Sequence, residues 1–271
     1  MATPIILYRN LFRTSGAVIT SSGADSGYSA EDIADHRAYK GWQGNVLTSP
    51  QWINVDVGAS GANADSILVV NHNLVANAGQ ITVYADTVNP PLTTVQAAYS
   101  PTSDHADYKA FSAPGAKRYW RVEFTDPAAP FTSKPFAGEI LLGMKLECPE
   151  YAAPDVDPYL DDVEAISNRS EGGHYLGAIL RGVTRRGRIR LGGEAGVLRS
   201  WLTSDGFDFM RNHYRKLLPF GLVFDSADSE LAPARWLKKP DSHRSPLASV
   251  GGIYLRFAFD LEVEEAMMEA A

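Results

Sequence analysis

The chain has a single cysteine, Cys148, among its 271 residues, which excludes an internal disulfide and a zinc site built from several cysteines. No segment approaches the roughly 18 uncharged apolar residues that a membrane-spanning helix requires. A basic N-terminus followed by a long apolar stretch is absent as well, so we expect no secretory signal. Acidic residues outnumber basic ones by 32 to 25, and the net charge of −7 disfavours a general nucleic-acid binder. We therefore expect a protein made in the cytoplasm, with neither a membrane nor a sequence-specific nucleic acid as partner.

Known catalytic patterns are missing too. The six histidines show no spacing typical of metal ligands, and neither a Gly-x-Ser-x-Gly motif nor a phosphate-binding Gly-rich loop is present. The acid pairs Asp155/Asp157 and Asp161/Asp162 resemble the paired carboxylates of a glycosidase. They lie, however, in a segment interrupted by prolines, which would not hold them at a fixed separation. We expect no enzymatic activity, no catalytic residue and no resident cofactor.

Alternating apolar and polar residues dominate the rest of the chain and predict β-strands. Residues 51–58 place Ile53, Val55 and Val57 on one face, and residues 119–124 and 253–264 follow the same pattern. Helical spacing is confined to residues 205–218, which end before Pro219, and to a short turn at 30–34 with Ser29 as its cap. The pattern predicts an all-β protein with one α-helix packed on a sheet.

Length and composition favour two domains. Apolar residues make up 45% of the chain, enough for substantial cores, and the length corresponds to about two domains. Residues 149–162 contain three prolines and several acids, which disfavour both a helix and a central strand. We therefore predict a domain at 1–148, an extended linker at 149–162 and a second β domain at 163–271.

Six segments of residues 5–147 occur in an order and spacing typical of one known family: Ala17-Val-Ile-Thr-Ser-Ser22, Tyr28-Ser-Ala-Glu-Asp-Ile-Ala-Asp35, Gly41-Trp42, Gln51-Trp-Ile-Asn-Val-Asp-Val-Gly58, Arg118-Tyr-Trp-Arg-Val122 and Gly138-Glu-Ile-Leu-Leu-Gly143. In these segments residues 5–147 resemble the discoidin family, whose fold is a galactose-binding-like jelly roll. We therefore expect an eight-stranded sandwich in which Trp42 and Trp52 fill the core.

The resemblance implies ligand binding by loops at one end of the sandwich, with sugars as common ligands and calcium as a frequent structural ion. Asp32 and Asp35 are the calcium candidates, but His36 replaces the glycine that usually follows Asp35, and calcium needs six to eight oxygens. Sugar stacking requires exposed aromatic rings; the alternative is that such rings pack the bases of the loops. The candidate ligand-binding residues, all in predicted loops, are Tyr28, Tyr39, Tyr99 and Tyr108.

Residues 163–264 are expected to form strands, then one helix, then closing strands, and they contain the segments Asn168–Gly177 and Leu255–Leu261. In this order and in these segments they resemble the tail-tube-like fold of siphophage distal tail and other tail-tip proteins. It implies a ring component of the virion, a hexamer or a trimer, whose neighbours are tail tube, hub and fibre proteins. Ring subunits join through interfaces that close by rotation.

A cluster of arginines gives this second domain its one marked charge feature. Alternating strand positions would place Arg186, Arg188 and Arg190 on one face. One interpretation is an assembly interface formed by Arg181, Arg186, Arg188 and Arg190 against an acidic neighbour, or a contact with DNA passing through a tail lumen. The alternative is a solvated hairpin in which these arginines pair with local acids.

The sequence thus favours a structural virion protein of a bacteriophage tail tip or baseplate, a distal tail-like component joining tail tube to hub and fibres, with host-glycan contact as a further expectation. The alternative is a carbohydrate-binding module that recognises the host receptor. A third class, an accessory domain of a glycoside hydrolase, is disfavoured because no acid–base pair is evident.

Overall fold

The computed structural model describes residues 4–128, 130–148, 159–169, 175–191, 197–198, 205–223, 235–238, 256–257 and 259–265. The chain divides into two compact units, which are described separately. The first, here called the sandwich unit, contains residues 4–147 and the strand β15 (Phe220–Val223). The second, here called the hairpin unit, contains Cys148 and the described residues of 159–219 and 237–265.

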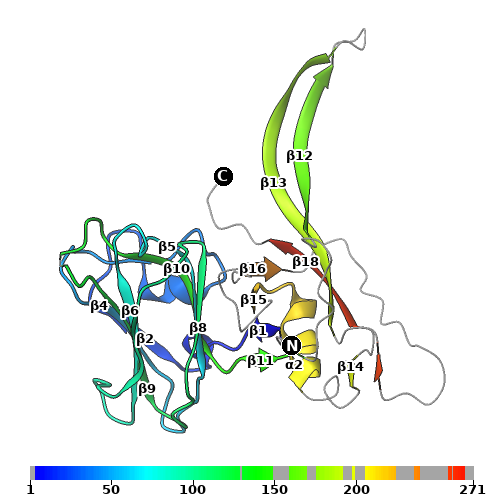
Figure 1. Ribbon diagram of the computed structural model, residues 1–271. Coiled ribbons are helices and arrows are strands. Elements are labelled where there is room, and N and C mark those ends of the chain that lie inside the picture. The colour runs from blue at the N-terminus through cyan, green and yellow to red at the C-terminus, as the bar shows by residue number, and fades with distance from the viewer. Residues whose placement is uncertain are drawn as a thin grey trace. The chain divides into compact units, whose positions relative to one another are not determined.

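The sandwich unit consists of two antiparallel sheets packed face to face (Figure 1). Short 3-10 helices, η1 (Leu11–Arg13) and η2 (Ala30–Ala34), lie between the first strands. The five-stranded sheet has the order β2 (Val18–Ser21), β4 (Gln51–Asp56), β9 (Tyr119–Thr125), β6 (Gln80–Asp86) and β7 (Thr94–Tyr99). The four-stranded sheet has the order β3 (Trp42–Gln43), β10 (Phe136–Gly143), β5 (Ser66–His72) and β8 (Ala106–Ala110).

The core forms where the alternating apolar residues of the two sheets meet. Ile53 and Val55 of β4 are fully buried, as are Trp120 and Val122 of β9. The ring of Trp42 stacks on that of Phe124, with centroids 5.8 Å apart. Burial of each such large side chain contributes about 1.5–3 kcal/mol to folding, so this interface between the sheets is the main source of stability of the unit.

Trp52 was predicted to fill the core, but it lies outside it. It precedes Ile53 and therefore points to the outer face of the five-stranded sheet, where the guanidinium of Arg121 lies 4.8 Å from the indole centroid. Trp120, rather than Trp52, is the second large indole of the core, with its Nε1–H donating to the Lys117 carbonyl at 3.1 Å. Strand alternation alone determines this difference.

The predicted turn at residues 30–34 is confirmed as η2. Ser29 caps it, and the Asp32 carboxylate accepts a hydrogen bond from the Ser29 backbone N–H at 2.9 Å, which completes a capping box. Ile33 is fully buried, so the turn anchors the long segment between β2 and β3 to the core.

Three further paired strands belong to the sandwich unit, outside its two main sheets. β1 (Ile5–Leu7) pairs antiparallel with β11 (Leu146–Glu147) on one side and with β15 on the other. Phe220, Leu222 and Val223 of β15 are buried. Gly221 leaves room for Leu68, because a Cβ at this position would lie 2.3 Å from Cδ2 of Leu68 and the leucine side chain would have to shift.

The hairpin unit is built around two long antiparallel strands, β12 (Tyr159–Arg169) and β13 (Tyr175–Leu191). β18 (Phe259–Glu265) pairs with residues Arg186–Leu191 of β13 and with Leu237 and Lys238 of β16 (Arg235–Lys238). β14 (Val197–Leu198) pairs with β17 (Arg256–Phe257). Residues 149–158 of the expected linker lie outside the described residues, whereas residues 159–162 belong to β12.

The helix of this unit is shorter than predicted. α2 spans Asp205–Asn212 and is followed by the 3-10 turn η3 (Tyr214–Lys216), whereas the spacing predicted one helix over 205–218. His213, with φ −128° and ψ −69°, leaves helical geometry, and Leu217 adopts a left-handed conformation. Phe209 and Tyr214 are nevertheless both buried, because the turn preserves the apolar face. Within the strand expected over 253–264, the described residues form β17 and the first six residues of β18, whereas residues 253–255 and 258 lie outside the described residues.

The all-β fold class is therefore confirmed, with α2 as the one α-helix among the described residues, and with a discoidin-like jelly-roll sandwich at the N-terminus that has nine strands in its two main sheets where eight were expected. Among the described residues, no helix has the length and apolar character needed to traverse a lipid bilayer.

Candidate functional site

Five connecting segments lie at the same end of the sandwich, because the antiparallel strands that they join begin or end there. The end of β9 at Thr125 lies opposite the start of β6 at Gln80, and the end of β5 at His72 lies opposite Ala137 near the start of β10. Ser21, the last residue of β2, lies opposite Ile53 near the start of β4. These segments, here called the loop end, are residues 22–41, 44–50, 73–79, 100–105 and the described part of 126–135.

An aromatic pair and an ion pair lie close together at the loop end. The rings of Tyr28 and Phe136 meet edge to face, with centroids 6.1 Å apart and an interplanar angle of 77°. Nζ of Lys134 donates to Oδ2 of Asp25 at 2.6 Å, and about a third of each side chain is exposed (37% and 32%). The Lys134 ammonium, followed by the backbone N–H of Ser26, holds the pKa of Asp25 below its ordinary value. We call these four residues the Tyr28 patch.

Backbone hydrogen bonds connect the two halves of this patch. The N–H of Asp25 donates to the Gln43 carbonyl at 2.8 Å, and the N–H of Tyr28 donates to the Asp25 carbonyl at 3.1 Å. Gln43 in turn lies opposite Phe136 in the pairing of β3 with β10. The loop after β2 is therefore tied to the strand that carries Phe136.

Two asparagines fix the segment that carries Lys134. Oδ1 of Asn73 accepts from the Phe136 N–H at 2.8 Å, and its Nδ2 donates to the Lys134 carbonyl at 2.9 Å. Asn77 is 1% exposed, and its Oδ1 accepts from the Ser133 N–H and the Thr132 hydroxyl, both at 2.8 Å. The patch is consequently held in place before any ligand binds.

The four predicted tyrosines do not form one site. Tyr28 and the 45% exposed Tyr39 both lie in the segment 22–41, as predicted. Tyr99 and Tyr108 were expected in loops, but they belong to β7 and β8, because both are strand-favouring residues that pair with neighbouring strands. Both of their hydroxyls are buried, and burial raises the pKa of each phenol. Tyr99 and Tyr108 thus serve as packing residues of the sheet edges.

Sequence reasoning did not identify Asp25, Lys134, Phe136, Asn73 or Asn77. Asp25 and Lys134 are 109 positions apart, so no local pattern links them. The asparagines and the glycine of residues 71–79 are typical of a turn and could have indicated a loop. They do not indicate that Asn73 and Asn77 hydrogen-bond to the segment that carries Lys134.

The calcium candidates do not have the ligand geometry of a calcium site. The Asp35 carboxylate accepts from the backbone N–H and Nε of Arg37 at 2.8 and 2.7 Å. The Asp32 carboxylate accepts from the Ser29 N–H and from Nζ of Lys40, the latter at 3.1 Å. Within the described ranges no group of three or more His, Cys, Asp or Glu side chains is placed to bind a metal. In this structure the Asp35 carboxylate is paired with Arg37 and the Asp32 carboxylate with Lys40.

His36, which replaces the usual glycine, turns back onto a buried glutamate. With φ 69°, His36 directs its backbone N–H to Oε2 of Glu139 at 2.9 Å, and its Nδ1 lies 3.6 Å from Oε1. The Glu139 side chain is fully buried in β10, and this burial raises its pKa well above the ordinary value. The loop is therefore attached to the four-stranded sheet through a buried carboxyl group.

A second buried histidine lies at the end of β5. Nδ1 of His72 lies 3.2 Å from the Leu74 backbone nitrogen, and the neutral ring can accept a hydrogen bond from this N–H. Burial lowers the pKa of His72 to about 4, although Asp104, at 3.1 Å from Nδ1, acts in the opposite direction. The Asp104 carboxylate accepts from the Val75 N–H at 2.8 Å, so His72 and Asp104 together organise the segment 73–79.

The predicted arginine interface lies on β13, whose backbone alone is described. Arg181, Arg186, Arg188 and Arg190 all belong to this strand. The register sets Arg186 opposite Glu264, Arg188 opposite Glu262 and Arg190 opposite Asp260 of β18. Oppositely charged residues at directly paired positions stabilise a sheet, so this register agrees with the alternative in which the arginines pair with local acids.

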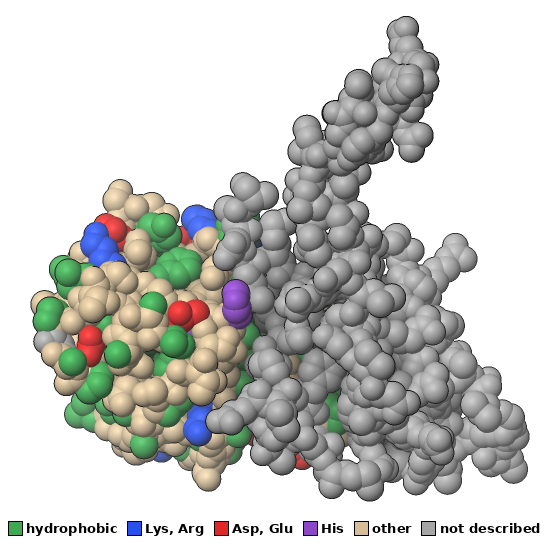
Figure 2. Space-filling view, turned by 45° about the horizontal axis from the view of Figure 1, so that its top comes forward, with side chains coloured by type: hydrophobic (Ala, Val, Ile, Leu, Met, Phe, Trp, Pro, Cys, Tyr) green, Lys and Arg blue, Asp and Glu red, His purple; other side chains and the backbone are tan. Residues whose placement is uncertain are grey.

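The exposed surface carries no dominant charge on the face shown in Figure 2. There, Lys and Arg side chains and Asp and Glu side chains of the sandwich unit are scattered among uncharged ones. The described residues on this face therefore create no field of a single sign.

No protein-family model and no curated protein matches the chain. The chain is similar to a chitosan-binding module from a chitosanase/glucanase of Paenibacillus sp. IK-5 (22% identity, 50% of this chain and 98% of that chain, TM-score 0.41). It is also similar to a Clostridium perfringens module, CpGH89CBM32-5, in complex with GalNAc-β-1,3-galactose (10%, 49% and 98%, TM-score 0.40). A further match is a Ruminococcus gnavus GH29 fucosidase in complex with fucose (14%, 51% and 27%, TM-score 0.40). At these TM-scores the strand order itself remains the evidence for the fold.

Proposed function

We propose that the sandwich unit is a carbohydrate-binding domain without catalytic activity and that the Tyr28 patch contacts the sugar. The observation that supports this proposal is the juxtaposition of the Tyr28–Phe136 aromatic pair with the Asp25–Lys134 ion pair. Aromatic rings pack against the C–H faces of a pyranose, and charged groups form strong hydrogen bonds with its hydroxyls. The anchoring by Asn73 lowers the ordering cost of binding.

A glycan array probed with the full chain tests this function. Tyr28→Ala and Lys134→Ala are each expected to lower the affinity for the best-bound glycan at least about tenfold, or roughly 1.4 kcal/mol. Tyr119→Ala is the matched control, because Tyr119 lies at the opposite end of β9 on the outer face. Absence of binding to every glycan, or equal binding by all three variants, would contradict the proposal.

We also propose, as a second function, that the hairpin unit is an assembly module of a tailed-phage virion. The observation that favours it is the length of the β12–β13 hairpin: residues Tyr175–Arg185 of β13 pair with β12 and, in the part of the chain that is described, with no further strand. A two-stranded hairpin alone is marginally stable in water, which favours a neighbouring subunit as its support. The chain would then act at the tail tip, between tail tube, hub and fibres, after synthesis in the bacterial cytoplasm.

Light scattering on the purified full chain, with electron micrographs of virions, tests the assembly function. Arg186→Glu with Arg188→Glu is expected to prevent ring formation. Because these positions lie opposite Glu264 and Glu262 in the register, a matched variant that also carries Glu264→Arg and Glu262→Arg restores the cross-strand charge pairs. This matched variant is also expected to form no rings, because the arginines that contact the neighbouring subunit are still absent. Ring formation by the first variant, or a stable monomer of the wild-type chain that is absent from virions, would refute an assembly interface at these arginines.

A further inference from the structure

We propose that the open edge of β2 binds an extended strand of a partner protein, one apolar side chain of which enters the cavity beside β2. β2 is the first strand of the five-stranded sheet and pairs with β4 on one side. Within the residues that the structure describes, no strand pairs with its other side. This surface is distinct from the Tyr28 patch and from the arginines of β13, although Glu31 and Ala34 beside it belong to the segment 22–41.

The backbone of β2 carries hydrogen-bonding groups directed away from the sheet. The Ser22 N–H donates to the Trp52 carbonyl at 2.9 Å, which continues the register in which Ser21 lies opposite Ile53. In an antiparallel pair, alternate residues direct their N–H and C=O groups toward the partner strand. Ser22, Thr20 and Val18 therefore face β4, and Ile19 and Ser21 face outward.

The other edges of the two sheets carry features that discourage strand addition. β8 has the charged residues Asp107 and Lys109, β7 has two register shifts against β6, and β3 is only two residues long. Charges, irregular pairing and short length are the means by which natural edge strands avoid pairing with other chains. β2, with the sequence Val-Ile-Thr-Ser, is regular and uncharged, and the side chain of Val18 is 59% exposed.

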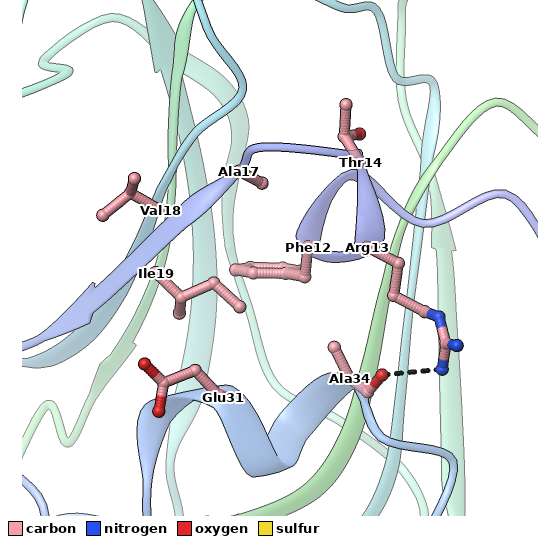
Figure 3. A pocket seen from close by; sticks show the side chains of 8 residues that line it. All are labelled: Phe12, Arg13, Thr14, Ala17, Val18, Ile19, Glu31 and Ala34. Atoms are coloured by element: carbon pink, nitrogen blue, oxygen red, sulfur yellow. Dashed lines mark hydrogen bonds between the residues drawn. The ribbon is translucent and has the colours of Figure 1, made fainter.

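A cavity of about 480 Å³ lies beside this edge, between β2, η1 and η2 (Figure 3). Apolar side chains of Phe12, Ala17, Ile19 and Ala34 line it, and Figure 3 shows Phe12 and Ile19 approaching each other across it. Arg13 and Glu31 also line it, and Nη1 of Arg13 donates to the Ala34 carbonyl at 2.7 Å. The cavity thus offers apolar contact together with one charge of each sign.

The hydrogen-bonding groups of the β2 edge and the cavity beside it indicate which partner binds there. Outward N–H and C=O groups at Ile19 and Ser21 require an extended backbone, and the side chains of Phe12 and Ala17 offer contact to an apolar side chain opposite Ile19. A second copy of β2 fits less well. Full overlap of two β2 strands would set the outward-facing Ile19 opposite Thr20, whose backbone groups face β4, so self-pairing is possible only with a shifted and shorter register.

A library of short linear peptides displayed on a carrier, selected against the full chain, tests the proposal. Enriched peptides are expected to share one large apolar residue between strand-favouring residues and to lack a central proline. Ser21→Pro, which removes an outward N–H, and Ala17→Phe, which fills the cavity, should each lower the affinity for an enriched peptide at least about tenfold. Ala97→Phe, an exposed position on the opposite edge strand β7, is the matched control and should bind like the wild type.

Hydrogen exchange with the peptide bound provides the second readout, since the amides of Ile19 and Ser21 should become protected. This measurement on the unmodified chain decides the question even if a variant lowers stability. The proposal is overturned if the wild-type chain enriches no peptide, or if the bound peptide leaves both amides exchanging as before. It is also overturned if light scattering shows a dimer that Ser21→Pro abolishes, because the occupant would then be a second copy.

Discussion

Replacement of Glu139 by glutamine should make the sandwich unit progressively more stable than the wild type as the pH rises. Burial raises the pKa of Glu139 well above 4.5, so the folded state retains a proton that the unfolded chain releases. Between pH 4.5 and the folded-state pKa, the wild type therefore loses about 1.4 kcal/mol of unfolding free energy per pH unit through this group. Glu139→Gln does not titrate, and its amide oxygen can still accept the His36 N–H that Oε2 accepts at 2.9 Å.

Urea unfolding followed by tryptophan fluorescence, between about pH 5 and about pH 8, measures this difference because Trp42 and Trp120 are buried in the core. Glu147→Gln is the matched control, since the Glu147 side chain is 59% exposed. The difference between wild type and Glu139→Gln should grow with pH, whereas that for the control should stay constant. A constant difference for Glu139→Gln, or one that shrinks with rising pH, would show that Glu139 is ionised in the folded state at neutral pH.

Three further outcomes follow from the loop end. Asn77→Ala leaves the Ser133 N–H without its acceptor and should lower the unfolding free energy by about 1–3 kcal/mol in urea titrations; an unchanged midpoint would contradict the anchoring role. The ring of His72, with its pKa near 4 against an ordinary 6.5, should remain neutral in NMR titrations until the pH falls toward 4. Its contribution to stability is complete above pH 6.5 and declines as the pH falls from there toward 4, so a titration midpoint near 6.5 would refute the burial argument. Thermal unfolding should occur at the same temperature in excess calcium and in excess EDTA, because Arg37 already occupies the Asp35 carboxylate; a higher temperature in calcium would show that the ion displaces it.

The strands of the sandwich could be predicted because each buries one face, which leaves a period of two in the sequence. β4 and β9 follow this pattern residue by residue. The same rule places Trp52 outside the core, where size alone had suggested the opposite. The end of α2 could not be predicted, because its apolar spacing continues through the 3-10 turn that replaces the helix after Asn212.

The candidate site was harder to predict than the fold. Tyr28 could be selected as an aromatic residue in a loop, but its neighbours Phe136 and Lys134 come from a distant strand and the loop before it. Tyr99 and Tyr108 satisfied the same compositional rule and yet lie in strands. Composition identifies residues able to contact a sugar, whereas only the pairing of strands determines which of them meet.

The pairing of β1 with β15 has a practical consequence for anyone who divides this polypeptide. A truncation after residue 148 would follow the domain boundary predicted from the sequence. It would, however, remove Phe220–Val223 and expose the backbone of Ile5–Leu7, with which those residues pair. It would also empty the space that Phe220 and Leu222 occupy, both of them fully buried. The sandwich unit is discontinuous in sequence, because β15 begins more than 70 residues after the end of β11. Excision at that point is therefore expected to yield a destabilised, aggregation-prone fragment, and the intact polypeptide is the appropriate reagent for binding studies.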